Sequence, residues 1–301
     1  MKILLTGRNG QLGWELARAL APLGEVGALD RQELDLAVPD QIASAVRSLR
    51  PDVLVNAAAY TAVDRAESEP DAAHAINATA VGILAEEAKR AGALLIHYST
   101  DYVFDGIKDA PYVEADPPNP LNAYGRSKLA GELAIRNVDG SHLILRTSWV
   151  YATRGRNFFL TMRRLLKERD EVRVVSDQIG APTSAQALAD TTAELLGRHG
   201  AAALGDAGGV YHATAGGYTS WHGFATEIAR LERSDFPVRI VPIASSEYPS
   251  PARRPTNSRL SNEKLTQHFG IALPRWETCL ATCHAELKRG APVDAGTRYR
   301  R

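Results

Sequence analysis

The sequence is short of cysteine, of net charge and of long apolar runs, and each shortage excludes a class of protein. Two cysteines in 301 residues cannot build the disulfide framework of a small secreted domain. The 35 basic residues balance the 35 acidic ones, so no overall field draws the chain to nucleic acid or an anionic membrane. No apolar stretch approaches the roughly 20 residues that span a bilayer, and the first is too short for a signal peptide. We therefore expect a compact cytoplasmic protein with a small-molecule partner.

The two cysteines, Cys279 and Cys283, lie four residues apart in a stretch with a helical pattern, and His284 follows them. Side chains four apart share one face of a helix. Because the spacing matches no common metal-ligand motif, we expect two buried, unreactive thiols.

Short apolar runs alternate with helical patterns through the first half of the chain. The expected strands are 2–5, 26–29, 53–55 and 94–98, and the expected helices between them are 11–21, 40–49 and 72–91. This alternation is typical of βαβ units, whose right-handed crossovers give a parallel sheet with helices on both faces. Two further apolar runs, 143–145 and 172–175, are expected to complete the sheet. The pattern predicts an α/β protein with a Rossmann-type doubly wound parallel sheet.

Three glycines, Gly7, Gly10 and Gly13, follow the first expected strand and lead into the first expected helix. Glycines at this spacing permit a tight turn, close approach of the backbone to a pyrophosphate, and close packing of helix against strand. The helix N-terminus adds free N–H groups and a positive dipole. In this context the loop predicts a dinucleotide site.

Asp30 directly follows the second expected strand, close to the position of the acid that binds the adenine ribose in such folds. A carboxylate there favours NADH, because it repels the 2′-phosphate of NADPH. The neighbouring Arg31 is able to pair with the same phosphate. Together the two residues leave the choice between NADH and NADPH open.

The pattern loosens beyond about residue 150, where proline and glycine separate shorter elements. We expect a dinucleotide-binding domain over 1–150, completed by a return segment near 170–210. A smaller, mainly substrate-binding lobe is expected over 151–290, and a polar tail over 291–301.

Tyr124 and Lys128 lie one turn apart on a helix that is expected to begin after Pro118-Asn119-Pro120. A nearby ammonium favours the phenolate and so lowers the pKa of a tyrosine, which otherwise titrates near 10. Such a pair is suited to protonating a carbonyl oxygen while hydride reaches the carbon. The spacing alone is also common on solvated helix faces.

Polar residues emerge at the carboxyl end of the fourth expected strand, the edge where doubly wound sheets bind ligands. The hydroxyl of Thr100 can hydrogen-bond a substrate carbonyl there, and Asp101 is a second candidate. Ser99 and Tyr102 are as compatible with structural roles.

These motifs resemble the extended short-chain dehydrogenase/reductase family. The resemblance rests on the glycine loop, on Asn56-Ala57-Ala58-Ala59, on Ser99-Thr100-Asp101, and on Tyr124 with Lys128. It extends over about residues 1–288. Finer segments narrow it to the branch that reduces the C4 keto group of dTDP-4-dehydro-L-rhamnose to give dTDP-L-rhamnose; they are 59–64, 99–106, 146–151, 177–183, 251–255 and 257–260.

The resemblance implies an oxidoreductase that takes hydride from NADPH or NADH and a proton from Tyr124, with Lys128 and Thr100 assisting. Besides the glycines and Arg31, the residues that it implies along the cofactor are Gln11, Leu12, Asp30, Asp35, Leu36, Ala59, Tyr60, Thr61, Tyr98, Tyr124 and Lys128.

The resemblance also implies that Thr100, Asp101 and Trp149 face the sugar, although a tryptophan at a strand end is equally compatible with the core. Arginines in a proline-rich loop fit a cluster that meets diphosphate oxygens, and a charged surface loop is the alternative; they are Arg253, Arg254 and Arg259.

Some family members bind Mg²⁺ through glutamates at a dimer interface. Glu15 and Glu286 match that pattern, but Gln186 stands where another glutamate would be. Losing an anionic oxygen ligand weakens a magnesium site, so the resemblance supports Mg²⁺ only weakly and a tightly bound metal is not predicted. Whether the chain forms a homodimer stays open.

Two other functions fit the same fold. One is a noncatalytic regulatory subunit, as in a related branch that retains the dinucleotide fold. The other is a nucleotide-sugar epimerase or dehydratase, which returns the hydride to the sugar and holds its cofactor tightly. Intact Tyr124, Lys128 and Thr100 favour the reductase over the regulatory subunit.

Overall fold

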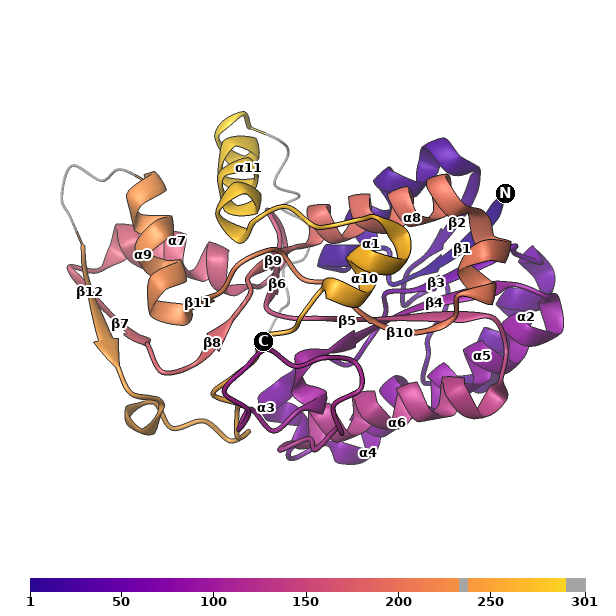
Figure 1. Cartoon of the computed structure of the whole chain (residues 1–301), viewed down its shortest axis with the longest axis horizontal. Helices are drawn as coiled ribbons and strands as arrows, with labels where there is room; N and C mark the ends of the chain where they lie inside the picture. Colours follow the sequence, from indigo (N-terminus) through magenta and orange to yellow (C-terminus); the bar gives the residue numbers. More distant parts are fainter. Residues whose placement is uncertain (233–237, 291–301) are drawn as a thin grey trace.

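A computed structural model describes residues 1–232 and 238–290, and the expected tail at 291–301 lies outside these residues. The molecule has two parts side by side (Figure 1). The larger part contains a central sheet with helices above and below it. The smaller part contains α7 (Phe158–Glu168), α9 (Trp221–Glu232) and α11 (Trp276–Lys288) with short strands.

The central sheet has six strands in the order β10-β5-β4-β3-β1-β2, and every neighbouring pair is parallel. Its strands are β1 (Lys2–Thr6), β2 (Glu25–Leu29), β3 (Val53–Asn56), β4 (Leu94–Thr100), β5 (His142–Thr147) and β10 (Gly209–His212). This confirms the predicted α/β class. The strand order reverses between β1 and β3, and ligands bind beyond the carboxyl ends of strands at such a switch point.

One expected strand of this sheet is elsewhere. The run 172–175 forms β7 (Glu171–Val175), which pairs with β12 (Arg239–Ile243) in a separate two-stranded sheet. Buried Val172 and Val174 alternate with exposed residues in β7, whereas all four residues of β3 are buried. Alternation marks a strand with one buried face, and a continuous apolar run marks the interior of a parallel sheet. The sixth strand is instead β10.

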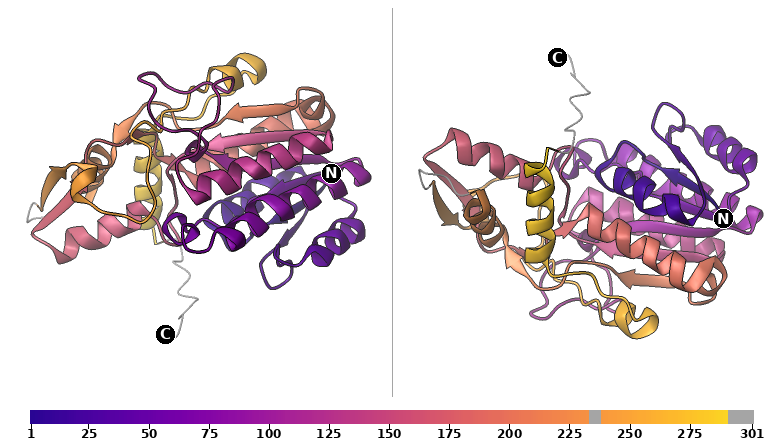
Figure 2. Two further views of the ribbon diagram at one scale, coloured as in Figure 1. Left: turned by 90° about the horizontal axis from the view of Figure 1, so that it is seen from below. Right: turned by 90° about the horizontal axis from the view of Figure 1, so that it is seen from above.

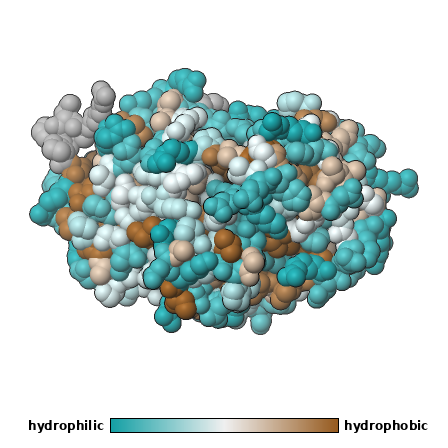
Figure 3. All heavy atoms as spheres, in the orientation of Figure 1, coloured by the Kyte–Doolittle hydropathy of each residue, from teal (hydrophilic) through white to brown (hydrophobic). Residues whose placement is uncertain are grey.

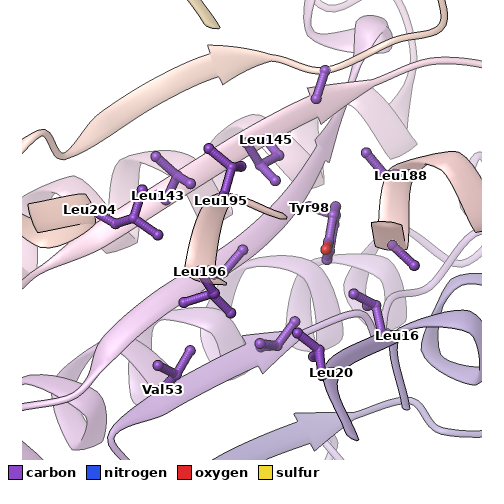
Figure 4. Packing of buried hydrophobic residues seen from close by; sticks show 14 of the residues in the cluster. Leu16, Leu20, Val53, Tyr98, Leu143, Leu145, Leu188, Leu195, Leu196 and Leu204 are labelled. Atoms are coloured by element: carbon purple, nitrogen blue, oxygen red, sulfur yellow. The ribbon is translucent and has the colours of Figure 1, made fainter. Parts of the chain in front are cut away.

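Helices cover both faces of the sheet (Figure 2). On one face lie α1 (Gln11–Leu20) and α8 (Ala185–Asp206), and on the other lie α2 (Pro39–Leu49), α5 (Ala80–Ala91) and α6 (Ala123–Val138). Ile3 and Leu5 pack into the cluster on the first face, and Leu4 packs into the second. Figure 4 shows Leu16 and Leu20 of α1 near Leu188 and Leu196 of α8 in the first cluster.

The expected helix 72–91 is interrupted by a π-helical turn. This stretch of the chain forms α4 (Pro70–His74), the π-helical turn Ala75–Thr79, and α5. Within the turn, the buried Asn77 accepts a hydrogen bond from the backbone N–H of Tyr60 and donates to its carbonyl and to Ser127 of α6. Such turns are often found at functional sites, and this one ties the loop after β3 to α6.

The smaller part has its own core, formed by α7 (Phe158–Glu168), α9 (Trp221–Glu232), α11 (Trp276–Lys288), β7 and β12. Cys279 and Cys283 are buried in it as free thiols, which confirms their predicted structural state. The remaining elements are 3-10 turns at Ala21–Leu23, Asp101–Val103 and Ser245–Glu247, α3 (Val63–Ala66), β6 (Val150–Tyr151), β8 (Ile179–Gly180), β9 (Thr183–Ser184), β11 (Thr219–Ser220) and α10 (Glu263–Phe269).

The face of the molecule in Figure 3 is mostly hydrophilic, with hydrophobic residues in small groups. Among the described residues, every helix is too short or too polar to cross a membrane.

Candidate active site

A cavity of about 590 Å³ lies at the carboxyl ends of the central strands, a size suited to small-molecule ligands. It brings together residues that lie far apart in the sequence. The predicted site residues along its wall are Gly7, Gly10, Gln11, Leu12, Arg31, Asp35, Leu36, Ala59, Thr61, Tyr98, Thr100, Asp101, Tyr124, Lys128 and Trp149. The predicted residues that do not line it are Gly13, Asp30, Tyr60, Arg253, Arg254 and Arg259.

The glycine loop forms one end of the cavity and leaves no room for side chains. Gly7 has a φ of +78°, and a Cβ there would lie 2.9 Å from the backbone nitrogen of Ala58. A Cβ on Gly13 would lie 2.0 Å from the carbonyl oxygen of Gly7. Gly10 caps α1 without any side-chain hydrogen bond, which leaves the first amide groups of the helix for a ligand. Free amide groups at a helix N-terminus, with no side chains in the way, suit an anion such as a pyrophosphate.

Asp30 lies beside this loop, where several donors already hold its carboxylate. Arg8 and Asn9 of the glycine loop donate to Oδ2 over 2.8 and 3.0 Å, and Oδ1 accepts from the backbone N–H of Gln32. Arg31 pairs with Asp35 over 3.3 Å at the surface. Sequence reasoning missed Arg8, although its basic side chain falls between two of the glycines.

Tyr124 projects from the first turn of α6, which begins after Asn122. The Asn122 side chain accepts from the N–H of Gly125 over 2.8 Å and so caps the helix. Tyr124 is partly open to the cavity, but the surrounding protein raises the pKa of its phenol to about 12, and a hydrogen bond with Thr100 only partly offsets this. Lys128 was expected to lower the pKa of this phenol, but burial has the larger effect. Tyr124 therefore stays protonated at neutral pH.

Lys128 lies one turn further along α6 and is almost fully buried. Burial lowers the pKa of its ammonium to about 8, and the charge of Glu132 acts in the opposite direction. The ammonium nitrogen lies 2.6 Å from the carbonyl oxygen of Tyr98 and 3.1 Å from Nε2 of His97. Sequence reasoning missed His97, whose position beside the lysine depends on packing between β4 and α6.

Asp101 is buried next to Thr100 at the end of β4. Thr100 donates to Oδ1 of Asp101 over 3.1 Å, whereas Oδ2 has no hydrogen-bond partner in the described part of the chain. Burial raises the pKa of this carboxyl to about 6. The unpartnered oxygen leaves one position for a polar group of a ligand.

Trp149 also lines the cavity and has a left-handed backbone with a φ of +48°. Its indole stacks on Trp221 of α9, with ring centroids 3.5 Å apart and an angle of 8° between the planes. Gly180 lies against the indole, and a Cβ there would be 2.6 Å from Cε2 of Trp149. Bulky residues rarely adopt this backbone region, and such strain often occurs at functional sites. Trp221, which also lines the cavity, was missed.

The three predicted arginines lie in the loop 251–259, between β12 and α10. Arg254 pairs with Asp64 over 2.8 Å, and Arg259 donates to Oδ1 of Asn257 over 2.8 Å. Arg253 is exposed, and its carbonyl accepts from Asn122 at the start of α6. Their contact with a diphosphate stays a prediction.

A segment of the second half, residues 152–157, contacts the glycine loop and α1. Asn157 donates to Oε1 of Gln11 over 2.8 Å, and the guanidinium of Arg154 stacks 3.8 Å from the ring centroid of Trp14. Arg156 is exposed, lines the cavity, and forms no ion pair within the residues that the structure describes. Sequence reasoning missed Arg156, because a basic residue in a loop carries no signal of its neighbours.

The described residues contain no cluster of three or more histidine, cysteine or acidic side chains that could hold a metal ion. Glu15 is buried and pairs with Arg18 over 2.8 Å. A bound Mg²⁺ is therefore not supported.

Comparisons with known proteins agree with this geometry. The family model described as RmlD substrate binding domain matches residues 1–289. A dTDP-4-dehydrorhamnose reductase of Burkholderia thailandensis is 55% identical over 295 residues, which is 95% of this chain and 99% of that protein. A reductase of the same name from Escherichia coli is 50% identical over 285 residues, covering 92% of this chain and 95% of that protein.

A crystal structure of a dTDP-4-dehydrorhamnose reductase from Bacillus anthracis in complex with NADP has a TM-score of 0.88 and 36% identity, covering 95% of this chain and 99% of that one.

Proposed function

Because the chain belongs to the RmlD substrate-binding domain family, we propose that it reduces the C4 keto group of dTDP-4-dehydro-L-rhamnose to give dTDP-L-rhamnose, with NADPH or NADH as the hydride source. The observation that carries this function is one cavity shared by the glycine loop, Thr100, Tyr124, Lys128 and Trp149. Such a reduction needs a dinucleotide site and a proton donor, and the indole of Trp149 adds an apolar face for a sugar ring.

The cofactor fits the end of the cavity formed by the glycine loop. The amide groups at the start of α1 bind its pyrophosphate, and the missing side chains of Gly7 and Gly13 allow its close approach. Arg156 adds a positive charge near the same phosphates. When bound, the reduced nicotinamide supplies the hydride.

The adenine ribose lies near Asp30, Arg8 and Arg31. Asp30 accepts from ribose hydroxyls when NADH binds. The guanidinium groups of Arg8 and Arg31 meet the 2′-phosphate when NADPH binds. The presence of both charges near one ribose supports the use of both cofactors.

Tyr124 donates the proton from its phenol to the C4 oxygen. Its raised pKa suits this role, because an acid must hold its proton until charge develops on the carbonyl oxygen. Thr100 turns its single hydroxyl proton from Asp101 to the same oxygen. The ammonium of Lys128 holds the nicotinamide ribose and stabilises the phenolate that remains.

The sugar lies between Tyr124 and Trp149, with its hydroxyl groups next to Asp101. An indole face packs against the apolar face of a sugar ring. The arginines of the loop 251–259 meet the diphosphate of the substrate. In this arrangement the domain over 1–150, with α8 and β10, binds the dinucleotide, and the rest of the chain up to residue 290 binds the sugar nucleotide.

The test is to follow the loss of reduced-nicotinamide absorbance with enzymatically prepared dTDP-4-dehydro-L-rhamnose, and to identify the product by mass and NMR. We expect one NADPH or NADH to be oxidised for each dTDP-L-rhamnose formed. An unchanged absorbance with a cofactor that stays bound through purification would instead indicate an epimerase or dehydratase.

A further inference from the structure

A row of buried polar side chains crosses the sheet and ends at Lys128. In the register of the parallel strands, Thr6 of β1 pairs with Asn56 of β3, and Asn56 pairs with His97 of β4. Thr6 Oγ1 donates to Oδ1 of Asn56 over 2.6 Å, and Nδ2 of the same amide lies 3.0 Å from Nδ1 of His97. His97 Nε2 then lies 3.1 Å from the Lys128 nitrogen. Each strand thus contributes one polar residue to a chain of hydrogen bonds.

The imidazole in this row is neutral. His97 is completely buried, and burial together with the charge of Lys128 holds its pKa well below the usual value. A neutral imidazole has one donor nitrogen and one acceptor nitrogen, whereas an ammonium can only donate. When Lys128 is charged, Nε2 is therefore the acceptor, and Nδ1 carries the proton.

The side-chain amide of Asn56 completes the row in either charge state of the lysine. In the structure its Nδ2 faces Nδ1 of His97, the orientation in which the amide donates to Nδ1 and Nε2–H of His97 faces a neutral amine. When Lys128 is an ammonium, the amide is turned, so that its oxygen accepts from Nδ1–H and its NH₂ group donates to Thr6 Oγ1. No member of the row then loses its hydrogen bond to its neighbour, so buried polar groups are tolerated at this depth.

An ammonium has three N–H groups, and the protein accepts two of them from Lys128. One points to the carbonyl of Tyr98, and one points to His97. The third is left for the cavity, which Lys128 lines. We propose that His97 is a positioning residue of the reaction, whose Nε2 keeps Lys128 charged and aims its remaining N–H at the cofactor ribose. This inference rests on the proposed function.

In the described part of the protein, the ammonium of Lys128 donates its hydrogen bonds to neutral acceptors and not to the charged groups around it. Glu132 lies one turn along α6, but its carboxylate pairs with Arg146 of β5 over 2.6 Å and accepts from Ser99 of β4. Tyr124 lies one turn before Lys128 on α6, and Asp101 follows β4. Among the described residues, no carboxylate forms a hydrogen bond with the ammonium.

Removing Nε2 leaves a buried N–H of the ammonium without an acceptor and so favours the neutral amine. In the variant His97→Leu, the pKa of Lys128 should fall further, and the alkaline limb of kcat should move to lower pH. The expected shift is about one pH unit, the size expected from one lost hydrogen bond to a charged group.

The experiment measures kcat against pH for the full chain with NADPH and the keto sugar nucleotide, and the Kd of NADPH against pH by fluorescence. His97→Gln restores an acceptor near the position of Nε2, so its profiles should return toward those of the unchanged protein. His212→Leu is the matched control, because His212 is equally buried and its ring has no hydrogen-bond partner in the described residues. Its alkaline limb should not move.

The NADPH measurement needs no substrate, so it tests His97 even where the proposed substrate is wrong. If His97→Leu does not fold, His97→Asn takes its place, since the shorter amide does not reach the Nε2 position. An alkaline limb of NADPH binding in His97→Leu or His97→Asn that matches the unchanged protein would overturn the inference. So would an equal shift in His97→Gln, because a packing role would not distinguish the two replacements.

Discussion

Adding a single methyl group at Gly180, by the substitution Gly180→Ala, would test the role of Trp149. A Cβ at Gly180 would lie 2.6 Å from the indole, whereas ordinary contact begins at 3.4 Å. In Gly180→Ala the indole must therefore move by about 0.8 Å, or its stack on Trp221 must open. Overpacking of this kind costs about 1 to 3 kcal/mol.

If half of that cost falls on substrate binding, KM for the sugar nucleotide rises about twofold to twelvefold, since 1.4 kcal/mol corresponds to a factor of ten. We expect kcat to change less, and the Kd of NADPH to stay the same, because a Cβ at Gly180 would press on the indole of Trp149 and not on the glycine loop.

The matched control is Gly216→Ala, also in the smaller part, where a Cβ would meet its nearest neighbour at 3.6 Å. Steady-state kinetics at varied sugar-nucleotide concentration measure both variants. An unchanged KM in Gly180→Ala, with a folded protein by circular dichroism, would refute the placement of the sugar against Trp149.

Three further predictions concern charge. Arg8→Gln should weaken NADPH binding about tenfold and NADH binding much less, because only NADPH carries the 2′-phosphate; equal losses in a fluorescence titration would contradict this role. Arg156→Gln should instead weaken both cofactors alike, by about threefold to tenfold at low salt and less at high salt, since an exposed charge is screened; the same titration at two salt concentrations decides. Glu132→Gln should lower the free energy of unfolding by about 3 to 5 kcal/mol, because it leaves Arg146 buried without its partner; urea denaturation that gives a loss below 1 kcal/mol would show that the pair is not structural.

Much of the sheet could be predicted from the sequence, because a strand buried on both faces reads as an unbroken apolar run. Four of the first five, β1, β3, β4 and β5, follow this rule, whereas β2 lies at the edge of the sheet and is only partly buried. The run 172–175 did not belong with them, and the alternation of Val172 and Val174 with charged residues was the signal. The π-helical turn at 75–79 had no such signal, since it depends on what Asn77 binds in the folded protein.

The outline of the site was also accessible from sequence, since glycines before a helix and polar residues after a strand have local causes. The environment of each group in the site could not be predicted from the sequence. Tyr124 was expected to have a lowered pKa from its spacing to Lys128, but burial raises it. The contact of His97 with Lys128 could be recognised only from the register of the strands. That of Trp221 with Trp149 could be recognised only from packing between the two parts of the molecule. These features arise from contacts between distant segments, which no local pattern encodes.

The central claim is that Tyr124 donates the proton, and the variant Tyr124→Phe tests it most directly. Phenylalanine keeps the ring and removes only the hydroxyl. The measurement is kcat for dTDP-4-dehydro-L-rhamnose with saturating NADPH, alongside the Kd of NADPH. The account predicts a loss in kcat of about 10² to 10⁴ with a nearly unchanged Kd. Turnover close to that of the unchanged protein would contradict it.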